Sequence, residues 1–163
     1  MRIRDFLESR AARFELILHR PSHSASHLAG SLHVPGRLVA KAVLVRAGEA
    51  FALAVLPATH RVDLGRLGQV LGESAMRIAT QDELESVFAD CEPGALPPFG
   101  HLYGMRTVID STLSGGSEIV FVANTTHEGV RMRFRDYEAI EAPIRARFAE
   151  AITPRRVRPR RAG

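Results

Sequence analysis

The sequence has few of the residues that mark several classes of protein. Cys91 is the one cysteine, so an internal disulfide is impossible, which suits a reducing compartment. No apolar run approaches the roughly 20 residues of a membrane span, and the first ten residues carry charges throughout, unlike a secretory signal. The apolar fraction of 45% is typical of a globular domain. We therefore expect a cytoplasmic protein without a membrane partner.

Lysine is also scarce, because Lys41 stands alone beside 21 arginines. It lies in L-V-A-K-A-V-L-V, the most apolar strand-like run, where alternation places it on one face with Val39, Val43 and Val45. An ammonium among valines costs free energy unless it finds a partner or a cleft. Its head either reaches solvent at a sheet edge or enters a pocket that needs a compact charge rather than a guanidinium.

Positive charge is concentrated at the C-terminal end. The net charge is +4, and T-P-R-R-V-R-P-R-R-A-G holds five arginines and no acid, so the rest of the chain is near −1. We predict one domain over residues 1–152 and a basic, disordered tail over residues 153–163. Arg155, Arg156 and Arg158 would contact nucleic-acid phosphates; a solvated terminus without a role is the alternative.

Helical and strand-like patterns alternate along the chain without an internal repeat. We expect helices over residues 2–10, from about Ser24, and from Asp63, which would be the N-cap of a helix with Leu64, Leu67, Val70 and Leu71 inward. A fourth helix should begin at the capping box Thr80–Glu83. A fifth should run from Asp136 to Phe148, with a kink at Pro143. Strands are expected over residues 14–18, 38–46, 50–56, 76–79, 105–109, 118–123 and 130–134. This order predicts an α+β fold with a mixed, largely antiparallel sheet.

The segment E-P-G-A-L-P-P-F-G, residues 92–100, fits neither a helix nor a central strand. Pro97 and Pro98 fix its backbone, while Gly94 and Gly100 allow a ligand to approach closely. Rigid loops beside a sheet are common sites of function.

Several of these stretches together resemble the YbaK/ProX family of free-standing aminoacyl-tRNA deacylases, which is related to the editing domain of bacterial prolyl-tRNA synthetases. The resemblance covers about residues 12–150. The order and spacing of the shared motifs are specific to the family, although no single motif is. The motifs are L-H-R-P after the first strand, V-P-G-x-x-x-x-K-A-V with Lys41, A-V-L-P-A, V-D-L, G-A-L-P-P-F-G and V-I-D.

The resemblance implies a single domain with a partial barrel and surrounding helices, and a metal- and cofactor-free hydrolase for mischarged aminoacyl-tRNA. It implies Lys41 and Gly100 as catalytic residues, because a cation and a backbone N–H can stabilise the negative charge that develops during ester hydrolysis. The remaining positions of the substrate pocket would be His19, Pro98, Phe99 and Asp110.

The sequence departs from the family pattern after the strand over residues 118–123. Many relatives have Ala-Gly there, whereas this chain has Ala123-Asn124. Asparagine tolerates a left-handed backbone, so the turn can survive. Asn124 and His127 add polar groups beside the expected pocket, where they would bind substrate or assist proton transfer; a solvent-exposed turn histidine is the alternative.

Three other features have ordinary explanations. His23 and His27 have HxxxH spacing but no further metal motif, so a surface pair is expected rather than zinc. Cys91 has no neighbour in sequence that would activate it. Arg131, Arg133 and Arg135 would share a strand face that is either solvated or in contact with phosphates.

Two functions therefore remain. The first is a deacylase that acts in trans on mischarged aminoacyl-tRNA. The alternative is a non-catalytic module of the same fold that binds tRNA or an aminoacyl-tRNA synthetase.

Overall fold

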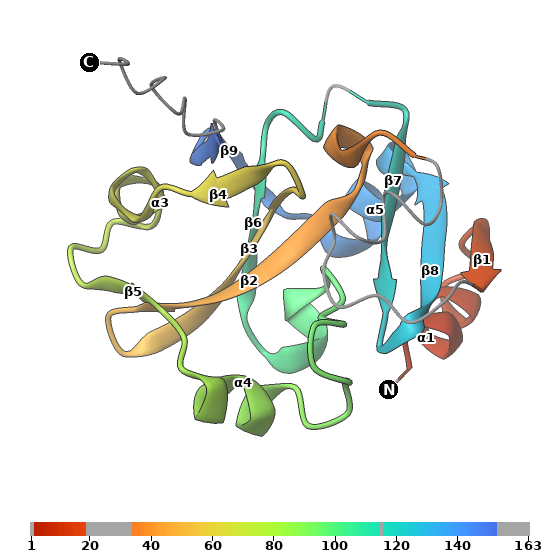
Figure 1. Ribbon diagram of the computed structural model, residues 1–163, viewed down its shortest axis with the longest axis horizontal. Helices are drawn as coiled ribbons and strands as arrows, with labels where there is room; N and C mark the ends of the chain where they lie inside the picture. Colours follow the sequence, from red (N-terminus) through yellow and green to blue (C-terminus); the bar gives the residue numbers. More distant parts are fainter. Residues whose placement is uncertain (1, 19–33, 115, 153–163) are drawn as a thin grey trace, which may run out of the picture.

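The structure, a computed structural model, describes residues 2–18, 34–114 and 116–152 of the 163-residue chain. Strands predominate, and helices lie between them (Figure 1). In chain order the elements are α1 (Ile3–Ser9), β1 (Phe14–Leu18), η1 (Gly36–Leu38), β2 (Ala40–Ala47), β3 (Ala50–Pro57), β4 (His60–Val62), α3 (Leu64–Leu71), β5 (Met76–Ile78), α4 (Gln81–Val87), η2 (Gly100–Tyr103), β6 (Arg106–Asp110), β7 (Glu118–Ala123), β8 (Thr125–Arg133), α5 (Phe134–Glu141), β9 (Ile144–Ala146) and β10 (Ala149–Ala151).

The strands form three sheets. The largest has the order β5-β2-β3-β6-β9, in which β2 pairs antiparallel with β3 and β5, while β6 pairs parallel with β3 and β9. The second sheet has the order β1-β8-β7 and is antiparallel, and the third is the antiparallel pair β10-β4. A single bridge from Val39 to Val120 joins the two larger sheets, which do not close into a barrel within the described residues. The predicted α+β class with mixed sheets is confirmed.

The largest sheet is covered on both faces, because alternate residues of each strand belong to different hydrophobic clusters. Leu44 and Val55 face the main core, and Val45 and Leu56 face a second cluster that contains Leu67 of α3. Two buried faces explain why β2 and β3 read as nearly continuous apolar runs.

The main core is centred on Phe99, which is completely buried. Its ring lies edge-on to those of Phe6, Phe121 and Tyr137, with centroid distances of 5.6, 5.5 and 5.2 Å. The Tyr137 hydroxyl donates to the Pro98 carbonyl at 2.7 Å. The proline end of the loop over residues 92–100 is therefore built into the core.

The capping signals at two predicted helix starts are confirmed. Asp63 caps α3 by accepting from the Arg66 N–H, and Thr80 and Glu83 form the capping box of α4. The inward position predicted for Val70 is wrong, because 37% of that residue is exposed.

The C-terminal part differs from the predicted helix. The helix α5 ends at Glu141, where Ala142 has a left-handed φ of 47° and Pro143 follows. Proline disfavours a helical backbone at the residue before it, so it ends this helix instead of kinking it. Phe148 is buried between β9 and β10, two short strands that the sequence did not predict, as it did not predict β4.

None of the helices in the described ranges is long and apolar enough to cross a lipid bilayer.

Because Phe99 fills the centre of the core, the Phe99→Ala variant should lose about 3–5 kcal/mol of unfolding free energy, measured by urea denaturation. The control variant Ile152→Ala changes a residue that is 54% exposed and should stay within about 0.5 kcal/mol of the parent. A loss below about 1 kcal/mol for Phe99→Ala would contradict this role.

Candidate functional site

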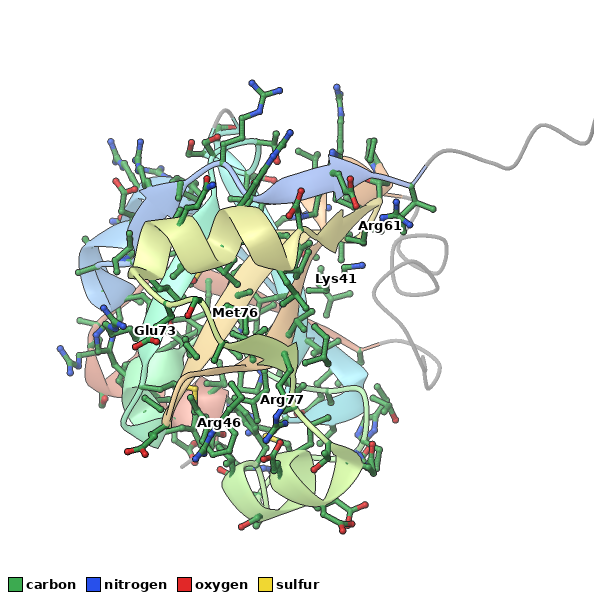
Figure 2. The ribbon with its side chains drawn as sticks, turned by 90° about the vertical axis from the view of Figure 1, so that its left-hand side faces the viewer. Lys41, Arg46, Arg61, Glu73, Met76 and Arg77 are labelled. Carbon is green, nitrogen blue, oxygen red and sulfur yellow. The ribbon has the colours of Figure 1, made fainter. Side chains whose placement is uncertain are left out.

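Lys41 lies in β2 on the face predicted for it, opposite Leu56 in the register with β3. On the same face, Val43 and Val45 belong to the second hydrophobic cluster and Val39 to a third. Lys41 is therefore the polar residue between two apolar clusters, and it is only partly exposed. Figure 2 shows it on the same side of the molecule as Arg61 of β4.

Burial lowers the pKa of the Lys41 ammonium from its ordinary value. Desolvation disfavours the charged form, and within the described part of the chain no carboxylate forms an ion pair with it. A partly desolvated cation interacts strongly with any negative charge that approaches it.

The loop over residues 92–100 approaches β2 through its glycine end. Ala95 is completely buried and packs in the third cluster with Val39, two residues before Lys41 on the same strand face. Gly94 has a φ of 81°, a left-handed conformation that glycine adopts without strain. Within the described residues, the N–H groups of Gly94 and Leu96 have no hydrogen-bond acceptor. This end therefore offers backbone donors that no acceptor in the described residues takes up.

Gly100 occupies a different place from the one predicted. Its N–H donates to the Thr107 hydroxyl at 2.9 Å, on the strand face that also carries Ile109 of the main core. Lys41 is on the opposite face of the same sheet, so the structure does not bring Lys41 and Gly100 together. In this geometry the Gly100 N–H is not free to bind a substrate oxygen.

A methyl group at position 100 would also disturb the fold. A Cβ atom there would lie 2.5 Å from the Thr107 hydroxyl and 3.1 Å from the Met105 carbonyl. The Gly100→Ala variant is therefore a poor probe of catalysis, because lost activity would accompany lost packing.

Pro98 and Phe99 do not fit the substrate contacts predicted for them. Both are buried, and they contact Tyr137 through the Pro98 carbonyl and the Phe99 ring. They hold the loop in place from the core side.

Asp110 likewise holds the structure together. It is completely buried, and its carboxylate accepts from the N–H groups of Thr112, Phe148 and Ala149. These hydrogen bonds outweigh burial and lower the pKa of the carboxyl. Its position does not fit a substrate contact, because no part of it is accessible.

Asn124 has the predicted left-handed backbone, with a φ of 68°. It is buried; its side chain accepts from the Ile3 N–H at 2.7 Å and donates to the Cys91 sulfur at 3.3 Å. It therefore joins α1 to the start of the loop. His127 of β8 is exposed, which matches the alternative of a surface histidine.

Several predicted residues lie outside the described residues. They are His19, the HxxxH pair His23 and His27, the helix from Ser24, and the tail arginines Arg155, Arg156 and Arg158. Elsewhere in the chain, no three potential metal ligands of the His, Cys, Asp or Glu type are grouped in a way that would hold an ion.

A polar network beneath the loop was not predicted. Glu141 of α5 is 2% exposed and accepts from the Thr107 hydroxyl at 2.5 Å, and its Oε1 lies 2.9 Å from His101 Nδ1. Burial is the largest influence on Glu141 and raises the pKa of its carboxyl. The sequence signal that covered Glu141 was the helix pattern over residues 136–148. Such a pattern does not show that Glu141 is buried or that Thr107 and His101 are its partners.

The family described as "Aminoacyl-tRNA editing domain" matches residues 19–140. Among curated proteins, the chain is 31% identical over 98 residues to the proline–tRNA ligase of Thiobacillus denitrificans, covering 60% of this chain and 17% of that protein. It is 30% identical over 99 residues to that of Lactobacillus gasseri, covering 61% and 17%. The chain thus spans less than a fifth of the length of these ligases.

Solved structures with little sequence identity share the fold. The hypothetical protein APE2540 has a TM-score of 0.83 at 16% identity, covering 91% of this chain and 99% of its own. A protein described as "a putative trans-editing enzyme for prolyl tRNA synthetase" has a TM-score of 0.78 at 20% identity, covering 91% and 95%.

The Thr107→Val variant should lose about 1–3 kcal/mol of unfolding free energy, because a methyl group leaves the Gly100 N–H and the Glu141 carboxylate without their shared partner. Urea denaturation at pH 7 measures this loss. The Thr107→Ser variant keeps the hydroxyl and serves as the control. Equal losses in the two variants would contradict the hydrogen-bonding role.

Glu141 should make stability depend on pH. Because its pKa is higher in the folded chain than the ordinary 4.5, the folded state binds more protons just above pH 4.5, and stability falls as the pH rises through that window. Glu141→Gln removes this contribution. The difference in unfolding free energy, parent minus Glu141→Gln, should therefore decrease as the pH is raised from 4.5 to neutrality. A difference that does not change with pH would contradict the raised pKa.

Proposed function

Because the chain belongs to the aminoacyl-tRNA editing domain family, we propose that it hydrolyses the ester bond of mischarged aminoacyl-tRNA in trans. The observation that carries the proposal is the partly buried Lys41, whose pKa is lowered and which lies on an otherwise apolar strand face. The protein described as a trans-editing enzyme matches the chain over nearly its whole length, which supports action as a separate protein.

Lys41 would act through its charge. During hydrolysis a water oxygen bonds to the carbonyl carbon, and negative charge develops on the carbonyl oxygen. The ester bond to the terminal ribose then breaks, and a proton from the water passes to the ribose oxygen. A fixed ammonium beside the developing charge lowers the barrier more in a partly desolvated site than in water.

The Gly94 end of the loop would supply the backbone donors assigned to Gly100 from the sequence. Gly94 and Leu96 have unpaired N–H groups within the described residues, and Ala95 between them belongs to the same hydrophobic cluster as Val39. Such donors bind an anionic oxygen without reorganisation, because the buried proline end fixes the loop. His127, exposed on β8, remains a candidate for proton transfer.

One observation favours the alternative of a non-catalytic module that binds tRNA or a synthetase. The N–H of Gly100 is taken by Thr107, so one of the two predicted catalytic groups is occupied. In the enzyme, Lys41 would govern the rate of ester hydrolysis. In the binding module, it would affect only the affinity for tRNA or a synthetase.

Substitution of Lys41 distinguishes them. Lys41→Met removes the charge, and Lys41→Arg keeps it on a wider, planar group. Both variants should lower the hydrolysis rate of mischarged tRNA at saturating substrate on the order of a hundredfold or more. The melting temperature of Lys41→Met should equal or exceed that of the parent, because a partly buried charge is removed.

The control is Arg106→Met, which removes an exposed cation at the start of β6 and should leave the rate unchanged. An active Lys41→Arg enzyme would contradict the requirement for lysine. Parental activity in Lys41→Met would contradict the site itself, and hydrolysis of no mischarged tRNA by the parent would favour the binding module.

The basic tail should add affinity rather than chemistry. Deleting residues 153–163 removes five arginines, so tRNA binding should weaken and its salt dependence should flatten. Turnover at saturating tRNA should remain close to that of the full chain. Unchanged binding across a salt titration would show that the tail has no such role.

A further inference from the structure

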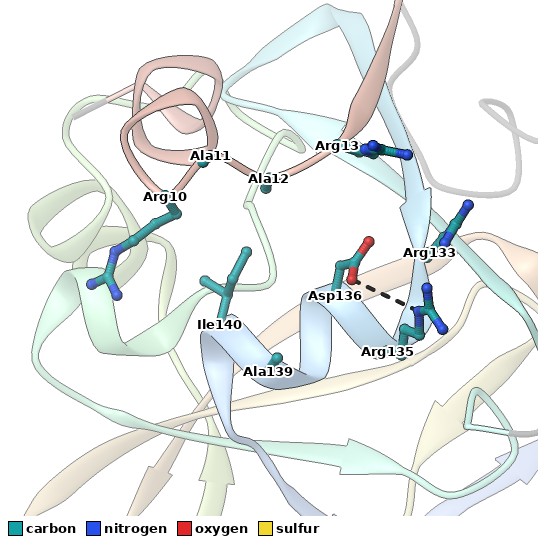
Figure 3. Close-up of a pocket in the computed structure, with 9 residues that line it drawn as sticks. All are labelled: Arg10, Ala11, Ala12, Arg13, Arg133, Arg135, Asp136, Ala139 and Ile140. Atoms are coloured by element: carbon teal, nitrogen blue, oxygen red, sulfur yellow. Dashed lines mark ion pairs between the residues drawn. The ribbon is translucent and has the colours of Figure 1, made fainter.

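Four arginines gather around one surface cavity of about 470 Å³ that lies away from Lys41. Arg10 comes from the end of α1, Arg13 from the segment before β1, and Arg133 and Arg135 from the junction of β8 and α5. Figure 3 shows Arg13, Arg133 and Arg135 together at one side of the cavity, and Arg10 at the other. These four residues are called the arginine face.

The sheet register brings two of these charges close together. Phe14 pairs with Met132 in the antiparallel ladder of β1 and β8. Continuing that register by one residue sets Arg13 opposite Arg133. Like charges directly opposite each other destabilise a sheet, so this pair costs stability unless an anion lies between or above them.

Few acids compensate the arginine face. Asp136 lines the same cavity and lies 4.0 Å from Arg135, and the Arg10 guanidinium stacks over the Phe6 ring at 5.3 Å. Glu118 is opposite Arg133 in the register with β7, but its ion pair is with Arg131, at 3.7 Å. Within the described ranges, Arg10, Arg13 and Arg133 have no ion pair, so the cavity carries an excess of positive charge.

The sequence pattern identified this surface only in part, through Arg133 and Arg135. It grouped Arg131, Arg133 and Arg135 on one strand face, whereas Arg135 lies in α5 and Arg131 pairs with Glu118. In the folded chain, Arg133 and Arg135 line one cavity with Arg13, which is distant in sequence, and Arg131 does not line it.

We propose that the arginine face binds the phosphate backbone of the tRNA, while its aminoacyl end lies at Lys41. The identity of the RNA rests on the proposed function. Guanidinium groups bind phosphate oxygens through paired N–H donors. The charges lie on two sides of the cavity (Figure 3), an arrangement that suits successive phosphates of a chain better than a single anion. Such contacts position the RNA without reading its sequence.

The test is the double variant Arg13→Gln/Arg133→Gln, with affinity for uncharged tRNA measured across a salt titration. Losing two phosphate contacts should reduce the slope of log affinity against log salt by about 1.4 to 1.8, that is, 0.7–0.9 per contact. The hydrolysis rate at saturating mischarged tRNA should stay at the parental value. The melting temperature should be equal or higher, because a repulsive pair is removed; a purely structural role for these residues would lower it.

The matched control is Arg106→Gln/Arg147→Gln, which removes the same charge from exposed positions that do not line the cavity. An equal loss of slope in the control would overturn the proposal, since only net charge would then matter. An unchanged slope in Arg13→Gln/Arg133→Gln would also overturn it.

The two proposals can fail separately. A parent protein that binds uncharged tRNA through the arginine face but hydrolyses no ester would support the surface and contradict the enzyme. A parent that hydrolyses mischarged tRNA with an Arg13→Gln/Arg133→Gln variant of unchanged affinity and slope would support the enzyme and contradict the surface. No binding of tRNA by the parent at low salt would overturn the surface.

Discussion

The position of the loop over residues 92–100 depends on the burial of Phe99. The ring lies among those of Phe6, Phe121 and Tyr137, which come from α1, β7 and α5, and the Tyr137 hydroxyl holds the adjoining Pro98 carbonyl. Aromatic burial on this scale is worth several kcal/mol. The core therefore fixes one end of the loop, and Ala95 at the other end belongs to a separate cluster that contains Val39, just before β2.

This arrangement gives the two ends of the loop different tasks. The Pro97–Gly100 end belongs to the main core, and the Gly100 N–H is consumed by Thr107. The Gly94 end keeps N–H donors without an acceptor in the described residues, and its Ala95 belongs to the same hydrophobic cluster as Val39. The same sheet separates Gly100 from Lys41, so Gly100 cannot supply a backbone donor to a site built on Lys41. The arginine face, on α1, β8 and α5, would then hold a different part of a long anionic substrate.

Local sequence signals predicted much of the fold because they act over a few residues. The alternation in β2, the caps at Asp63 and Thr80, and the left-handed Asn124 are all of this kind. The same alternation placed Lys41 on its strand face, and the family resemblance implied a catalytic role for it. What could not be predicted depends on contacts between distant segments. The family resemblance implies that Phe99 and Asp110 line the substrate pocket. In the structure the Phe99 ring packs against Tyr137, and the Asp110 carboxylate accepts from the Phe148 N–H. Helical periodicity through Phe148 concealed the strands after Pro143, because alternating apolar residues over so short a stretch fit either period.

The central claim is that this chain is an enzyme that acts on aminoacyl esters. The most direct measurement is the rate of ester loss from a panel of mischarged tRNAs, with and without the protein, alongside the same tRNAs correctly charged. The account predicts that at least one mischarged tRNA is hydrolysed with multiple turnovers, and that its correctly charged counterpart is spared. Ester half-lives that the protein does not shorten for any member of the panel would contradict it.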